Sequence, residues 1–295
     1  MNIQQRVDHL IDTRPGKELL IPTYDDPAHA IVDGLVYRSG GTTAAYCVLT
    51  DRGRVIVNTG MGYEAPHHKR VFAAIRPGPT HYIITTQAHV DHVGGVERLR
   101  ARWSPEVFGP GDEPIDGIDR RCAHGDSITV PGLELRLSVI GVPGHTRGHI
   151  AYFGERYGDD PRPLLFCGDT LFAAGCGRLF EGTADQMWAS LSALAALPAE
   201  TRVFCAHEYT LANLRFASAV EPANPAIAER VARERAKRER GLPTLPSTIA
   251  EERRTNPFLR VADPQVRAIA EAQAGRKLAG DAEVFRALRD WKNAF

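Results

Sequence analysis

The segment Thr86-Gln-Ala-His-Val-Asp-His-Val-Gly-Gly95 gathers side chains that bind metal ions. His89, Asp91 and His92 place two imidazoles and one carboxylate on a single short loop. This combination of nitrogen and oxygen donors suits zinc or a similar divalent metal. A short cluster of this kind also arises by chance, so the segment predicts a metal site only if other parts of the chain supply further ligands.

Three other segments supply single donors where a strand is expected to end. His145, Asp169 and His207 each follow a short β-like run. Open α/β sheets collect their functional groups at the ends of strands. A lone histidine is usually structural, but four strand-end segments that all carry His or Asp favour one shared metal centre.

The elements that must position these donors alternate along the first two thirds of the chain. Short apolar runs bounded by turn residues predict strands, and longer runs between them predict helices at 95–102 and 184–197. Beyond residue 208 the composition predicts only helices. Interleaved strands and helices indicate a layered α/β or α+β core. The expected strands are 54–58, 81–86, 133–140, 164–167 and 202–205, and the expected later helices are 211–220, 225–241, 264–274 and 281–295.

Composition excludes several classes of protein. Lys+Arg and Asp+Glu are both 36, so the net charge is zero, which argues against a nucleic-acid or anionic-membrane binder. The five cysteines form no C-x-x-C pair, which predicts reduced thiols in a cytosolic protein. The first residues contain no apolar signal region, and no apolar run approaches the ~20 residues that span a bilayer. We therefore expect a cytoplasmic protein.

Extended blocks of sequence around and beyond these donors resemble one family. From about Val107 to Phe295 the chain is similar to the glyoxalase II (hydroxyacylglutathione hydrolase) family of the metallo-β-lactamase superfamily. The blocks that carry the resemblance are 143–149 (PGHTRGH), 168–172 (GDTLF), 175–184 (GCGRLFEGTA), 205–210 (CAHEYT), 213–217 (NLRFA), 220–222 (VEP), 246–248 (PST), 256–258 (NPF) and 288–292 (LRDWK).

The resemblance implies an α/β (α+β) fold with two domains. Residues 1–208 would form a metallo-β-lactamase-like αββα sandwich that binds metal and carries catalysis. Residues 209–295 would form a small helical domain that binds glutathione.

It also implies roles for individual residues. The first metal would take His89, His145 and Asp169, and the second would take Asp91, His92, Asp169 and His207, with Asp169 bridging. Asp91 and Asp169 would hold the metal and orient the nucleophile. The glutathione contacts would fall on Arg178, Tyr209, Arg289 and Lys292.

The activity implied is hydrolysis of glutathione thioesters, S-D-lactoylglutathione giving D-lactate and glutathione. One or two zinc ions per chain would generate hydroxide from water, although His/Asp sites also accept iron or manganese. Two alternatives stay open: another hydrolase of the superfamily, acting on an ester, sulfate ester, lactone or lactam, or a weakly catalytic metal- or ligand-binding protein. No nucleic-acid or membrane partner is expected, and the sequence does not indicate the oligomeric state.

The N-terminal third departs from the family. Gln87 stands where the family has the first His of T-H-x-H-x-D-H, and Asn58 stands where the superfamily has Asp. An amide oxygen is a weaker metal ligand than imidazole, so we expect a weak first metal site and a well-filled second one. The alternative is a structural variant that still binds the first metal. Phe180 replaces a tyrosine found in some members, and residues 1–40 are given no role.

Four other features receive structural interpretations. His67 and His68 are expected on an exposed helical stretch, and His149 is expected to be structural. Cys167 and Cys205 are expected as buried core thiols. The charged segment 230–240 is expected to be a solvated helix face with mixed-sign pairs, although an anionic-ligand patch is the alternative.

Overall fold

Two β-sheets form the centre of the protein. The structure is a computed structural model that describes residues 28–32, 34–40, 43–130, 135–157 and 160–295. One sheet has seven strands in the order β1-β2-β3-β4-β5-β6-β7, and the other has six in the order β15-β14-β11-β10-β9-β8. The strands of the first sheet are β1 (His29–Val32), β2 (Val36–Ser39), β3 (Ala45–Leu49), β4 (Arg54–Val57), β5 (Thr80–Ile84), β6 (Glu106–Pro110) and β7 (Arg120–Cys122).

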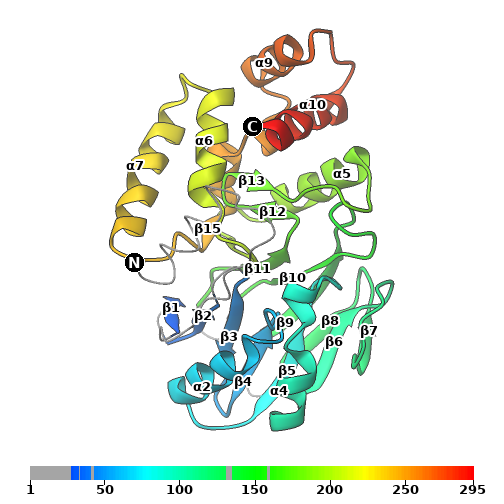
Figure 1. The fold of residues 1–295 in the computed structure, drawn as a ribbon, viewed down its shortest axis with the longest axis vertical. Helices are drawn as coiled ribbons and strands as arrows, with labels where there is room; N and C mark the ends of the chain where they lie inside the picture. Colours follow the sequence, from blue (N-terminus) through cyan, green and yellow to red (C-terminus); the bar gives the residue numbers. More distant parts are fainter. Residues whose placement is uncertain (1–27, 33, 41–42, 131–134, 158–159) are drawn as a thin grey trace.

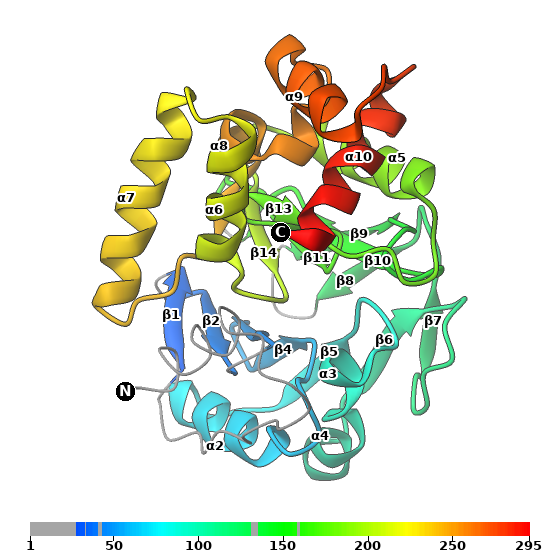
Figure 2. The ribbon, with the colours of Figure 1, turned by 45° about the horizontal axis from the view of Figure 1, so that its top comes forward.

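The second sheet lies face to face with the first, and helices cover both outer faces (Figures 1 and 2). Helices α2 (Ala65–Ile75) and α4 (Val96–Trp103) cover the first sheet, and α5 (Ala184–Ala195) covers the second. The expected αββα sandwich is therefore confirmed. The strands of the second sheet are β8 (Ser127–Val130), β9 (Leu135–Gly141), β10 (Ile150–Gly154), β11 (Leu164–Gly168), β14 (Arg202–Cys205) and β15 (Ser247–Thr248).

Alternate side chains of a strand pack into different layers of the core. In β4, Val55 and Val57 point into the core between the sheets, and Ile56 packs under α2 and α4. In β11, Phe166 enters the core between the sheets while Leu165 packs on the helical side. Because successive strand residues face opposite sides, strands that are apolar throughout must be covered on both faces.

The chain after β14 is mainly helical, as expected. It contains α6 (Thr210–Val220), α7 (Pro225–Glu239), α8 (Ile249–Thr255), a 3₁₀ turn (Pro257–Leu259), α9 (Pro264–Ala274) and α10 (Asp281–Ala294). The strand β15 and the short helix α8 were not predicted. β15 has two residues and pairs antiparallel with β14, so its signal depends on a distant partner rather than on its own sequence.

A buried polar network fixes this helical segment against the sandwich. Glu252 of α8 is fully buried and lies 2.7 Å from the Arg230 guanidinium of α7. The other carboxylate oxygen accepts hydrogen bonds from the backbone N of Ala174 (2.7 Å) and from Asn256 Nδ2 (3.0 Å). Ala174 lies in the hairpin of β12 (Leu171–Phe172) and β13 (Gly175–Cys176), so one carboxylate joins two helices to that hairpin.

Two structural expectations are wrong in part. His67 and His68 lie on α2 as expected, but both are buried, and His68 stacks on Phe72 with ring centroids 5.6 Å apart. Burial lowers the pKa of His68 to about 3, so the ring is neutral. On α7, Arg230 and Glu234 are also buried, so the charged segment is not simply a solvated face. The expected burial of Cys167 and Cys205 is confirmed.

We predict that Glu252→Ala lowers the free energy of unfolding by about 3–5 kcal/mol, because the buried Arg230 loses its 2.7 Å partner and keeps only a 3.7 Å contact with Glu251. Chemical denaturation monitored by circular dichroism measures this. Glu106→Ala is the matched control, since Glu106 pairs with Arg120 at 2.7 Å on the surface and its loss should change stability little. Equal losses in the two variants would contradict the assigned role of the network.

Candidate metal centre

Four loops that follow strands converge between the two sheets. The loop after β5 begins the short helix α3 (Val90–Val93) and carries His89, and the turn after β9 carries His145. Asp169 directly follows β11, and His207 lies two residues after β14. The parallel pairing of β11 with β14 brings the last two loops to the same sheet edge, as the sequence predicts.

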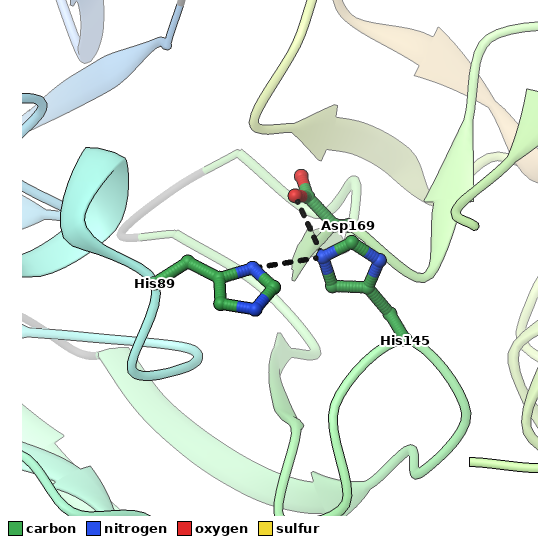
Figure 3. A group of neighbouring side chains, drawn as sticks. All are labelled: His89, His145 and Asp169. Atoms are coloured by element: carbon green, nitrogen blue, oxygen red, sulfur yellow. Dashed lines mark hydrogen bonds and ion pairs between the residues drawn. The ribbon is translucent and has the colours of Figure 1, made fainter. Parts of the chain in front are cut away.

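The first ligand group contains His89, His145 and Asp169, whose donor atoms all lie within 4.8 Å of one another. His145 Nε2 lies 3.2 Å from His89 Nδ1 and 3.2 Å from Asp169 Oδ2 (Figure 3). His145 Nδ1 donates a hydrogen bond to the carbonyl of Arg178 at 2.9 Å. That bond leaves Nε2 as the nitrogen with a free lone pair, which is the usual arrangement of a metal-binding histidine.

The second group contains Asp91, His92 and His207, with the same limit of 4.8 Å between donor atoms. Asp91 Oδ2 lies 3.3 Å from His207 Nε2 and 3.7 Å from His92 Nε2. Thr43 donates a hydrogen bond to Asp91 Oδ2 at 3.1 Å and so orients this carboxylate. Thr43 was not predicted, because it lies far away in the sequence and carries no metal-ligand signal.

One oxygen of Asp169 connects the two groups. Its Oδ2 lies 3.2 Å from His92 Nε2 and 3.3 Å from His207 Nε2, in addition to its contact with His145. Tetrahedral zinc with bonds of ~2.0–2.1 Å places neighbouring donors about 3.3 Å apart. The other oxygen, Oδ1, is buried and has no hydrogen-bond partner among the described residues. The donor spacing and this unsatisfied oxygen therefore fit bound divalent metal.

The electrostatics of the centre keep Asp169 ionised. Burial alone would raise the pKa of Asp169, but His207 and His92 outweigh it and hold that pKa well below its usual range. Burial likewise opposes charge on His207, yet the Asp169 carboxylate raises the pKa of His207 well above its usual value. The site is thus built to hold positive charge beside Asp169.

Gln87 lies inside the centre. It is fully buried, and its Nε2 lies 3.0 Å from Asp169 Oδ2 and 2.8 Å from His92 Nε2. Its Oε1 is buried without a hydrogen-bond partner among the described residues. In the orientation seen here the amide N–H group, not the oxygen, faces the ligands. A 180° rotation of the amide would be needed before Oε1 could contact a metal there.

Asn58 is connected to the second ligand group through Thr86. Thr86 donates to Asn58 Oδ1 through its backbone N and through its hydroxyl, both at 3.2 Å. The Thr86 hydroxyl also lies 3.4 Å from His92 Nδ1. The Thr86 hydroxyl therefore orients the His92 imidazole. The residue that in turn holds this hydroxyl is Asn58, a neutral amide and not a carboxylate.

His149 contributes more than packing. It is buried, burial lowers its pKa well below the usual value, and its Nε2 accepts a hydrogen bond of 3.1 Å from the backbone N of Asp169. This bond fixes the chain at the bridging carboxylate. The interpretation of His149 as structural understated this contact, which no local sequence signal reveals.

The four residues expected to bind substrate differ in exposure and in their contacts. Arg178 is exposed, and Tyr209 stacks on the His207 ring with centroids 4.9 Å apart. Arg289 of α10 is 4% exposed and donates to the carbonyl of Cys176 at 3.0 Å. Lys292 is partly buried and donates to the carbonyl of Ala212 at 3.1 Å.

Phe180 covers the exposed edge of the first ligand group. Its side chain is 62% exposed, and its ring lies 5.1 Å from that of His145 and 5.6 Å from that of His89. Val90, 61% exposed, neighbours His89 on the same loop. Two exposed apolar side chains therefore lie beside the first ligand group.

Family models match nearly all of the chain after residue 37. The model "Metallo-beta-lactamase superfamily" matches residues 38–121 and 123–207, and the model "Hydroxyacylglutathione hydrolase C-terminus" matches residues 208–295. A protein of Nitrosomonas europaea named "Hydroxyacylglutathione hydrolase" is 50% identical over 72% of this chain and 79% of its own. The chain belongs to the hydroxyacylglutathione hydrolase family of the metallo-β-lactamase superfamily. A second family member, from Pseudomonas putida, is 44% identical over 92% of this chain and 98% of its own.

Solved structures show the same fold at low sequence identity. ETHE1 from Myxococcus xanthus has a TM-score of 0.59 and 21% identity, over 88% of this chain and 99% of that one. The class B3 di-zinc metallo-β-lactamase LRA-12 from an Alaskan soil metagenome has a TM-score of 0.53 and 19% identity, over 75% and 98%. These two similarities support only the fold of the chain.

We predict that the purified family member holds nearer one than two tightly bound metals, because an amide replaces imidazole at position 87. Gln87→His should raise the metal content and increase kcat, since it adds a nitrogen donor beside Asp169. Elemental analysis after gel filtration measures the content. Gln87→Leu is the control: it removes the amide and should leave the more tightly held metal in place.

Two full metal equivalents in the unmodified protein, with no gain from Gln87→His, would show that Gln87 or a water completes the first site. The prediction would then be wrong.

Proposed function

We propose that this chain hydrolyses glutathione thioesters, with S-D-lactoylglutathione giving D-lactate and glutathione. The observation that carries the proposal is the pair of His/Asp groups joined by one oxygen of Asp169. Relatives that are 44–50% identical in the aligned residues carry the name "Hydroxyacylglutathione hydrolase", and this name indicates the substrate class.

We propose zinc as the metal, one or two ions per chain, with iron or manganese as alternatives that the donors also suit. His89, His145 and Asp169 would hold the first ion, and Asp91, His92, His207 and Asp169 the second. When bound, such a metal lowers the pKa of water toward ~7 and polarises a carbonyl.

The residues of the centre then have distinct tasks. Asp169 and Asp91 would hold the metal, whose positive charge would stabilise the oxyanion that forms from the thioester carbonyl. The Asp91 side chain is 23% exposed, so water and substrate can reach it from outside. Water loses a proton as its oxygen bonds to the acyl carbon, the carbon–sulfur bond breaks, and the thiolate takes up the proton released by that water to leave as glutathione.

The peptide part of the substrate would bind across the hairpin and the C-terminal helices. Arg178 is exposed beside His145, so its guanidinium can pair with a substrate carboxylate. Tyr209, Arg289 and Lys292 would complete this subsite from α6 and α10. We propose a domain boundary here, with residues 1–208 as the metal-binding catalytic domain and 209–295 as the glutathione-binding domain.

Location is proposed on separate grounds. Among the residues that the structure describes, no helix combines the length and apolarity needed to cross a bilayer. All five cysteines are free and buried. Unpaired cysteines favour a reducing compartment, and we propose the cytoplasm.

We predict that Arg289→Ala and Lys292→Ala each raise KM for S-D-lactoylglutathione roughly 10-fold or more while lowering kcat less. Groups that bind remote carboxylates act about equally on the ground and transition states, which is uniform binding. Steady-state kinetics measures both constants.

Arg286→Ala is the matched control, because Arg286 lies on the same helix but is 54% exposed and pairs only loosely with Asp185, at 3.7 Å. A KM that changes in neither test variant would favour a different substrate of the superfamily, such as a lactone or a sulfate ester.

A further inference from the structure

One buried carboxylate near the metal centre belongs to none of the loops that supply ligands. Glu113 lies between β6 and β7 and is 5% exposed. We propose that Glu113 is a positioning residue: it joins the loops that carry His89 and His145 and thereby sets the geometry of the first ligand group. This inference rests on the proposed metal binding.

The two carboxylate oxygens of Glu113 accept hydrogen bonds from different loops. Oε2 accepts from the backbone N of Ala88, the residue before His89. Oε1 accepts from the hydroxyl of Thr146, the residue after His145. The backbone N of Gly148, on the second loop, also donates to this carboxylate. An ionised carboxylate is an acceptor-only group with two oxygens, so it can serve all three donors at once.

The close approach of the His145 loop to Glu113 depends on glycine at position 148. A Cβ atom at Gly148 would lie 2.7 Å from Glu113 Cγ and 3.1 Å from the carbonyl carbon of Asp112. Neither distance is an ordinary van der Waals contact, so any larger residue at 148 would separate the loop from Glu113. Glycine at this position allows the carboxylate to reach both loops.

The backbone beneath Glu113 is itself fixed. Its carbonyl accepts hydrogen bonds from Ile115 N at 2.9 Å and from Arg121 Nη1 at 3.2 Å. Arg121 Nη1 also donates to the carbonyl of Gly111 at 3.1 Å. The carboxylate therefore extends from a braced turn, and it can hold the loops that carry His89 and His145 at a constant separation.

The second ligand group is anchored independently of Glu113. The carbonyl of His92 accepts hydrogen bonds from the backbone N and the hydroxyl of Thr59, at 2.8 and 2.9 Å. Ile150 N donates to the Thr86 carbonyl at 3.0 Å, which joins the sheets without Glu113. Loss of the Glu113 carboxylate should thus disturb the first group while the fold and the second group persist.

The test is a titration of metal-free protein with Co²⁺, whose visible absorption reports its coordination, and with Zn²⁺ in competition with a chelating dye. The proteins compared are the wild type and Glu113→Gln, each also in the Gln87→His background. The Gln87→His change identifies which of two binding phases belongs to the first group. Glu181→Gln is the matched control, because Glu181 accepts from Arg147 N at 3.0 Å on the same loop but is exposed.

We expect Glu113→Gln to weaken the first-group phase roughly 10–100-fold and to alter its Co²⁺ spectrum, because the amide NH₂ faces donors that need an acceptor. The second-group phase and the control variant should match the wild type. Gly148→Ala, which changes no charge and no ligand, should shift the same phase in the same direction.

An unchanged first-group phase in both Glu113→Gln and Gly148→Ala would overturn the inference. So would an equal loss from both phases, since that would indicate general unfolding. A wild-type protein that binds neither metal would overturn the proposed function as well, which separates that failure from a failure of Glu113 alone.

Discussion

The structure depends on bringing four separate loops to a single oxygen of Asp169. A buried carboxylate is costly unless positive charge surrounds it, and here His92, His145 and His207 all lie within 3.3 Å of the same atom. These imidazoles come from both sheets, so neither sheet can form the centre alone. The two sheets must therefore pack so that these imidazoles meet. The second oxygen of Asp169 is buried and has no hydrogen-bond partner within the described part of the chain, which leaves a place for bound metal.

Two kinds of contact meet this requirement. Alternating apolar strands pack the sheets against each other and against α2, α4 and α5, which fixes the coarse separation of the strand ends. Polar contacts then set the fine geometry, through Glu113 between two loops, His149 at the Asp169 backbone and Thr43 at Asp91. The Tyr46 hydroxyl adds a bond of 2.6 Å across the sheets to the carbonyl of Cys205, just before the His207 loop. Glu252 joins the C-terminal helices to the hairpin of β12 and β13.

Sequence reasoning could predict what local chemistry encodes. Apolar runs bounded by turn residues predicted β4, β5, β9, β11 and β14 and the ligand-bearing loops that follow four of them, because ligand type and strand periodicity are visible within a few residues. It could not predict Thr43, Glu113 or the contact of His149, because each acts on a segment distant in the sequence and none carries a ligand motif. It also placed His67 and His68 on the surface, since polarity suggests exposure, whereas Ser39 and Phe72 provide a buried environment for His68. Whether Gln87 binds metal depends on the orientation of one amide, which a sequence does not contain.

The most direct test of the account is to measure metal content and hydrolysis of S-D-lactoylglutathione together, in the wild type and in Asp169→Ala. Asp169 is the one side chain shared by both ligand groups, so the account predicts that Asp169→Ala loses both bound metal and thioester hydrolysis. Asp169→Asn, which keeps the shape but removes the charge, should lose most of both. A variant that lacks the carboxylate yet retains most of its metal and its activity would contradict the central role of this oxygen.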